Sequence, residues 1–90
     1  MTAQELETFR QKLLETMSFP GVYMFKLIVP SENRTIALVQ SLFEAEADIH
    51  TKSSDKGKYT SVTAKQVVIN VDEIIAVYVK ASEIKGVMFL

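Results

Sequence analysis

The sequence has no cysteine and a single histidine among its 90 residues. Disulfides, thiolate nucleophiles and cysteine-based metal sites are therefore excluded, and packing alone has to stabilise the chain. Glycine and proline are also scarce, with three and two copies, and 48% of the residues are hydrophobic against 23% charged. This composition excludes disordered and collagen-like classes and predicts one small globular domain.

Long apolar runs and a basic leader are missing as well. The longest clean apolar run, Ile74 to Val79, is far shorter than the 18 or more residues that a membrane-spanning helix needs. The first residues are polar and acidic, unlike the basic start and apolar stretch of a secretory signal. We therefore expect a cytoplasmic protein that does not enter the membrane.

An excess of positive charge is absent, because ten basic side chains face eleven acidic ones for a formal charge of −1. Nucleic acid is thus an unfavoured partner. The charges are nevertheless uneven along the chain: residues 32–48 sum to −3 and residues 50–66 sum to +3. The basic segment is either a lysine-rich strand edge that blocks pairing with neighbours or a site for an anion or an acidic partner.

Motifs that carry catalysis or bind cofactors are not found. The sequence contains no GxxxxGK[ST], GxGxxG or HExxH pattern. His50 has only Asp48 nearby, which is too few ligands for zinc and too few partners for a catalytic triad. The acidic pair Asp72-Glu73 precedes a helical pattern, where the helix dipole alone favours acids. We therefore expect no catalytic residue, no metal site, no cofactor and no enzymatic activity.

Hydrophobic periodicity divides the chain into helices and strands. Capping-box patterns, Thr2 with Glu5 and Asn70 with Glu73, predict the starts of two helices. The predicted order is a helix over 3–17, a central strand over 22–29, a helix from 31 to 43, a hairpin of 47–53 and 58–69, a helix over 70–84 and a strand over 87–90.

This order predicts an α+β fold, a ferredoxin-like βαββαβ sandwich with a four-stranded antiparallel sheet and two helices on one face. The expected division is an N-terminal amphipathic helix in residues 1–18 and a ferredoxin-like domain in residues 19–90. The other face of the sheet would be open. We expect the extra helix or another subunit to cover it, which makes a homodimer through this face a candidate assembly.

Two further expectations concern the sheet. The apolar positions of the last hairpin strand change parity, from Val62 and Ala64 to Val67 and Ile69, and this predicts a β-bulge near residues 65–66. Tyr23, Phe25 and Tyr59 on paired strands are similar in placing to the aromatic platform of an RNA-recognition motif. RNA binding through the sheet face and the basic hairpin is therefore the alternative function.

The sequence also resembles a known family. The residues that carry the resemblance are Phe19-Pro20 with Tyr23, Phe25 and Lys26, and the segment Ser-x-x-Gly-x-Tyr-x-Ser-Val from Ser54 to Val62, followed by the closing apolar strand. Over residues 19–90 they resemble the YbeD-like family of small uncharacterised bacterial proteins. The resemblance implies a ferredoxin-like fold similar to the ACT regulatory domain, and no established activity.

ACT-like domains bind small ligands at subunit interfaces near the turn from the first strand to the first helix, which here contains Ser31 and Asn33. The second candidate site is the hairpin, where loop N–H groups, lysines and hydroxyls could receive a small anion or an acidic partner. Its residues are Ser54, Lys56, Gly57, Lys58, Tyr59 and Ser61. The leading hypothesis is a non-enzymatic binding or regulatory domain that acts through protein–protein or small-ligand binding.

Overall fold

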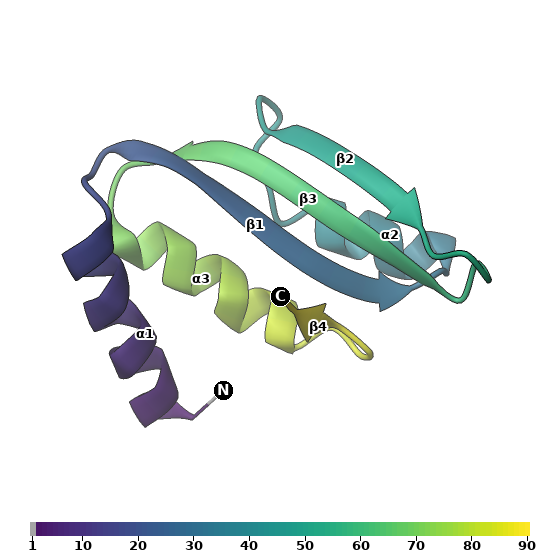
Figure 1. Cartoon of the computed structure of the whole chain (residues 1–90), viewed down its shortest axis with the longest axis horizontal. Helices are drawn as coiled ribbons and strands as arrows, with labels where there is room; N and C mark the ends of the chain where they lie inside the picture. The colour runs from purple at the N-terminus through teal and green to yellow at the C-terminus, as the bar shows by residue number, and fades with distance from the viewer. Residues whose placement is uncertain (1) are drawn as a thin grey trace.

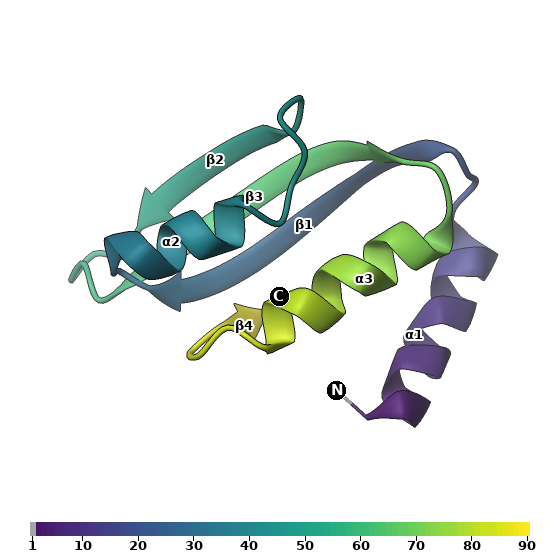
Figure 2. The same ribbon diagram turned by 180° about the vertical axis from the view of Figure 1, so that it is seen from behind.

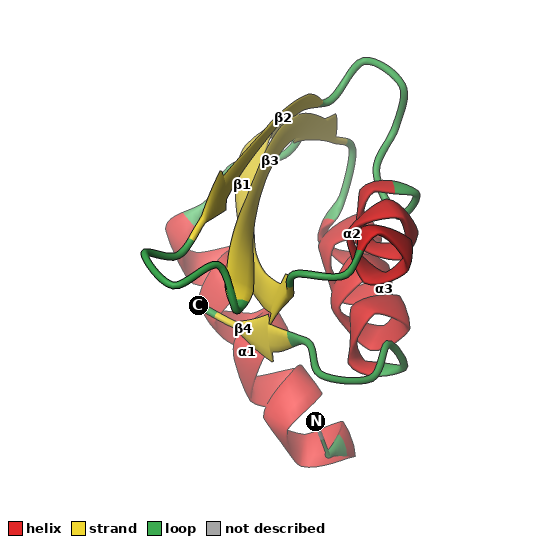
Figure 3. Ribbon diagram, turned by 90° about the vertical axis from the view of Figure 1, so that its right-hand side faces the viewer, coloured by secondary structure: helices red, strands yellow, loops and turns green. Residues whose placement is uncertain are grey.

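The computed structural model describes residues 2–90, which form three helices and one sheet (Figure 1). The elements are α1 (Ala3–Thr16), β1 (Gly21–Pro30), α2 (Asn33–Gln40), β2 (Asp48–Ser53), β3 (Tyr59–Val68), α3 (Val71–Ser82) and β4 (Met88–Phe89). The four strands are antiparallel in the order β2-β3-β1-β4. Helices α2 and α3 lie on one face of the sheet, and the opposite face is open (Figure 3). The predicted α+β class is confirmed.

The predicted starts of the first and last helices are confirmed, and one of the two capping boxes is complete. Thr2 and Glu5 form the full capping box, with the Glu5 N–H donating to the Thr2 hydroxyl at 3.1 Å and the Thr2 N–H donating to the Glu5 carboxylate at 2.9 Å. The bond from the Thr2 backbone N–H, followed by the contribution of the Thr2 side chain, stabilises the ionised carboxylate and lowers the pKa of Glu5. At α3 the Asn70 side chain accepts from Glu73, but the Glu73 carboxylate accepts from the Ile69 N–H instead of completing the box.

The second helix is shorter than predicted. It begins at Asn33 after the N-cap residue Glu32, which makes no side-chain capping bond. The Ser31 hydroxyl, expected near the cap, instead lies 2.8 Å from the Thr60 hydroxyl across the sheet. The helix ends at Gln40, because the chain turns there to bury Phe43 against the core. Tertiary packing thus outweighs the apolar periodicity at this end.

The expected β-bulge is wrong. Strand β3 pairs with β1 without interruption, from Tyr59 opposite Pro30 to Val68 opposite Gly21. The alternation therefore continues unbroken, with Val62, Ala64 and Val68 buried and Val67 exposed on the other face. The change of parity has another cause: the outer face of the sheet also carries apolar residues.

The core lies between the inner face of the sheet and helices α2 and α3. Phe25 is its aromatic centre, with its ring 4.7 Å from Tyr23, 5.2 Å from Phe43 and 5.8 Å from Tyr78. The Tyr78 hydroxyl is 3.2 Å from that of Tyr23. Burial and this hydrogen bond raise the pKa of Tyr78 above its ordinary range, because the site disfavours a phenolate.

The N-terminal helix packs at the side of α3 and does not cover the open face of its own chain (Figures 1 and 2). The Phe9 ring meets the Tyr78 ring edge-on at 5.0 Å, Leu13 is buried, and Arg10 forms an ion pair with Asp72 at the start of α3. Within residues 2–90, each helix is too short or too polar to cross a lipid bilayer.

Candidate functional site

The open face of the sheet concentrates exposed apolar side chains. Its strand residues are set by the pairing register, in which Val22 lies opposite Val67 and Ile28 lies opposite both Ser61 and Met88. Of ten large exposed apolar side chains in the described chain, five belong to strand positions on this face, and Ile69 and Leu90 directly follow β3 and β4 in the same alternation. The five strand residues are Val22, Met24, Tyr59, Val67 and Met88. Patches of this kind are typical of interaction surfaces.

Charges of opposite sign lie at the two ends of this face. Strand β2 runs from Asp48, next to the acidic loop with Glu44 and Glu46, to Lys52, next to the basic loop with Lys56 and Lys58. The acidic end has a hollow of about 290 Å³, lined by Val22, Glu44, Glu46, Asp48, Lys65, Gln66 and Val67. The uneven charge along the chain thus reappears in the loops at the two ends of the strands, while Lys65 lies opposite Asp48 at the acidic end.

The predicted hairpin site has a well-bonded turn. The Ser54 N–H donates to the Tyr59 carbonyl at 2.8 Å, and the Gly57 N–H donates to the Ser54 carbonyl at 2.9 Å. The Tyr59 N–H also reaches the Ser54 hydroxyl at 3.2 Å, and Gly57 has a φ of +71°. These bonds occupy three loop N–H groups within the turn itself. Ser54 and Gly57 therefore have a clear structural role in this loop.

A second hollow, of about 320 Å³, lies at the basic end of the open face. Its lining residues are Ile28, Lys52, Ser53, Ser54, Asp55, Tyr59 and Ser61. The hollow unites three of the predicted site residues, Ser54, Tyr59 and Ser61. It adds one cation, Lys52, and one anion, Asp55, so its charged lining is balanced. The Ser61 hydroxyl donates to the Lys52 carbonyl at 3.3 Å.

The other predicted site residues lie outside this lining. Lys56, Gly57 and Lys58 belong to the exposed loop beyond the hollow. Ser31 is attached to the same end of the sheet, because its N–H donates to the Lys58 carbonyl at 3.0 Å. Asn33 is exposed in the first turn of α2. The two predicted sites therefore adjoin, but they do not form one pocket.

Residues of the hollow that the sequence reasoning missed can be found from strand alternation. Ile28 and Lys52 share the outer face with Ser61, because each of them lies directly opposite Ser61 in the sheet. Given the correct register, a two-residue period would have placed all three together. The bulge predicted near residues 65–66 would move Val67 to the inner face, so the same alternation was missed for this residue.

In the described part of the chain, the acidic and histidine side chains do not converge into a metal-binding cluster. Within residues 2–90, no group of three or more His, Cys, Asp or Glu side chains is arranged to hold a metal ion. His50 and Asp48 are paired at 2.9 Å on the outer face, where both side chains are largely exposed. Two groups on an open strand form a surface pair that water screens.

The aromatic platform suggested for RNA is not formed. Phe25 is 1% exposed and lies on the inner face of the sheet, as does Tyr23, whereas Tyr59 lies on the outer face. Stacking of bases needs exposed rings on one surface. The three aromatic residues therefore cannot act together as a platform.

Comparisons with known proteins place the chain in a family. The model of the family described as "Protein of unknown function (DUF493)" matches residues 14–90. The UPF0250 protein of Shewanella piezotolerans is 34% identical over 80 residues, which cover 84% of this chain and 91% of the relative. The UPF0250 proteins of Shewanella halifaxensis and Shewanella oneidensis share 34% and 32% identity over the same coverage.

No solved structure matches the chain significantly. The family match begins within α1 and includes the whole sheet with α2 and α3. The resemblance to YbeD-like proteins, which rested on the segments around Phe19-Pro20 and from Ser54 to Val62, is thereby confirmed. The chain belongs to the DUF493 family of bacterial UPF0250, or YbeD-like, proteins.

Proposed function

We propose that the protein is a non-enzymatic binding module that works as a homodimer through the open face of its sheet. The observation that carries this proposal is the gathering of Val22, Met24, Val67, Met88 and Leu90 on one face of a small domain. Burial of such side chains is the main driving force of association. A second copy offers the same apolar surface in a symmetric contact.

The accessible surface area of the chain supports the proposal that a second copy covers part of it. The chain exposes 6049 Å². A compact monomer of this mass is expected to expose only about 5,300 Å². The excess is similar to the roughly 800 Å² that each partner buries in a standard interface. Helix α1 extends beside α3 (Figure 1), and the outer face of the sheet is uncovered (Figure 3).

The charges favour one orientation of the two copies. A twofold axis between the facing sheets and perpendicular to the strands reverses the strand direction of the partner. The acidic end with Glu44 and Glu46 then faces the basic end with Lys56 and Lys58 of the other copy. An axis parallel to the strands would bring like charges together, which opposes association.

Sedimentation equilibrium of the pure protein over a range of concentrations tests the proposal. We expect a dimer for the wild type and a monomer for Val67→Lys, because a charge at this position would be buried against the apolar side chains of the facing copy. Val79→Lys is the matched control, since Val79 is exposed on α3, away from the open face. Circular dichroism should show that both variants fold. A monomeric wild type would overturn the proposal.

A charge exchange tests the orientation. The double variant Lys56→Glu with Lys58→Glu should weaken the dimer, and the added changes Glu44→Lys and Glu46→Lys should restore it by re-creating opposite charges across the interface. If the quadruple variant stays as weak as the double one, the proposed orientation is wrong. A dimer that short single-stranded RNA dissociates would instead favour RNA binding, whose affinity should fall steeply with salt.

A further inference from the structure

A separate feature of the sheet is the unpaired edge of β1. Strand β1 has ten residues and pairs with β3 along its whole length, whereas β4 has two residues and pairs only with Leu27 and Ile28. One more bond follows, from the Leu90 N–H to the Lys26 carbonyl at 3.1 Å. Residues 21–25 therefore pair on one side only, and we call this stretch the β1 edge.

Backbone geometry shows which groups the β1 edge offers. The Lys26 carbonyl points away from β3, because it accepts from Leu90. Successive residues of a strand alternate, so the N–H and C=O groups of Met24 and Val22 point to the same side as those of Lys26. The stretch of five residues is about 17 Å long at the rise of an extended strand. It can pair with a further strand in line with β4.

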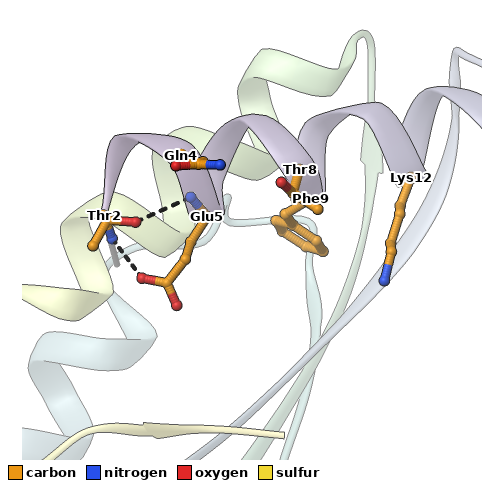
Figure 4. A pocket seen from close by; sticks show the side chains of 6 residues that line it. All are labelled: Thr2, Gln4, Glu5, Thr8, Phe9 and Lys12. Carbon is orange, nitrogen blue, oxygen red and sulfur yellow. Dashed lines mark hydrogen bonds between the residues drawn. The ribbon is translucent and has the colours of Figure 1, made fainter.

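The elements near this edge are α1 and β4. In Figures 1 and 3, α1 lies beyond the free end of β4, next to the start of β1. A hollow of about 500 Å³ lies against one side of α1, where Glu5, Phe9 and Lys12 project from the helix (Figure 4). Among residues 2–90, the charged side chains that line it are those of Glu5 and Lys12, which have opposite signs, so the hollow favours neither charge.

The inner side of the edge is aromatic. Tyr78 is the centre of this group, with ring contacts to Phe9 at 5.0 Å and to Phe89 at 5.1 Å and a hydroxyl contact to Tyr23 at 3.2 Å. Phe9, Tyr23 and Phe89 are only partly buried. A strand added beside β1 would direct every second side chain towards these rings. Apolar residues at those positions would complete their burial.

We propose that the β1 edge is a docking site for an extended segment of a partner protein. The segment runs antiparallel to β1 in line with β4, bonds to the backbone of Val22 and Met24, and places apolar side chains on Phe9 and Tyr23. This is strand addition, in which the backbone supplies affinity and alternate side chains supply specificity. The site is distinct from the proposed dimer contact, because it uses the edge of the sheet and not its face.

A lengthened chain tests whether the edge accepts a strand. Addition of Val-Thr-Val-Thr after Leu90 continues β4 with valines towards the aromatic side and threonines towards the open face. We expect at least tenfold slower hydrogen exchange of the Val22 and Met24 amides and a higher Tm. The control extension Val-Pro-Val-Pro lacks the N–H groups that would donate to Met24 and Val22. Equal exchange in the two variants, or slow exchange of both amides in the wild type, would overturn the proposal.

Binding in trans is tested with the acetylated and amidated peptide Val-Thr-Val-Thr-Val. Titration should shift the amide resonances of Val22 and Met24 in the wild type and leave them unchanged in the Val-Thr-Val-Thr extension, whose edge is occupied. Absence of these shifts in the wild type contradicts docking of a separate segment. The monomeric Val67→Lys variant should respond like the wild type, so that failure of the dimer proposal and failure of this one remain distinguishable.

Discussion

Strand β1 has two faces that are both largely apolar in sequence, although the outer one includes Lys26, and the two faces differ in environment. Phe25 and Leu27 are each 1% exposed on the inner face, whereas Val22 is 64% and Met24 is 52% exposed on the outer one. The inner face packs on two helices, and the outer face is uncovered (Figure 3). Apolar residues on both faces therefore identify a strand that can be buried on both sides. Within a single chain, however, the helices bury only the inner face.

The largest expected effect separates these two faces directly. Phe25→Ala removes the centre of the aromatic core and should lower the free energy of unfolding by about 3–5 kcal/mol. Met24→Ala, on the neighbouring residue, should change it by no more than about 0.5 kcal/mol in the monomer. Urea unfolding of both variants at a concentration that keeps the protein monomeric measures the difference. Similar losses would show that the outer face is buried even without a partner.

Two glycines at the same end of the sheet compare a packed turn with an exposed one. Gly86, before β4, has a φ of +86°, and a Cβ there would lie 2.8 Å from Pro30 Cγ. Gly57 has a φ of +71°, with no atom within 4 Å of such a Cβ. Gly86→Ala should cost about 2–4 kcal/mol, since backbone strain and overpacking combine. Gly57→Ala should cost about 1 kcal/mol from strain alone. Thermal unfolding measures the stability of both variants. A larger loss for Gly57→Ala than for Gly86→Ala would contradict this prediction.

Tyr78 on the inner side of the sheet and Tyr59 on the outer face provide a further comparison, in which Tyr78 makes the free energy of unfolding depend on pH. Burial first and the Tyr23 hydrogen bond second raise the pKa of Tyr78, so the folded protein keeps a proton that the unfolded chain releases above about pH 10. Stability is thus full below that pH and falls above it, by at most about 1.4 kcal/mol per pH unit. Tyr78→Phe should cost about 1 kcal/mol at pH 8 and reduce this slope. Urea unfolding at pH 8 and pH 11 measures this slope for the wild type and for Tyr78→Phe. Tyr59→Phe, on the exposed face, should change the free energy of unfolding by less than about 0.5 kcal/mol at pH 8.

The smallest effect concerns the polar part of the outer face. His50→Gln breaks the contact with Asp48, and both side chains are largely exposed. The free energy of unfolding should change by less than about 0.5 kcal/mol at pH 6, because water screens such a pair. A larger loss in urea unfolding would indicate that the outer face contributes to folding in the same way as the inner one.

Much of the fold could be predicted from the sequence, because local rules decide it. Thr2 and Asn70 cap their helices through contacts three residues away. Pro20 and Gly21 end the first helical pattern, and the element order follows from periodicity. The end of α2 could not be predicted, since the burial of Phe43 against distant strands sets it.

The candidate site was predictable only in outline. Ser54, Tyr59 and Ser61 were identified from their segment, and they do line one hollow. Ile28 and Lys52 complete it from two other strands, and their place depends on which residues lie opposite Ser61. Strand register is set by long-range pairing and face burial, so a bulge inferred from parity alone misplaced part of the face.

The sequence by itself determined the helices, the strands, their order and the uneven charge. These features depend on the period of side chains and on capping bonds, which act within a few residues. Only the tertiary structure decided that α1 packs beside α3, that charges of opposite sign lie at the two ends of one face, and that β4 leaves residues 21–25 of β1 unpaired. Those outcomes depend on which apolar surfaces are buried against one another, because burial stabilises contacts between residues that are far apart in the sequence.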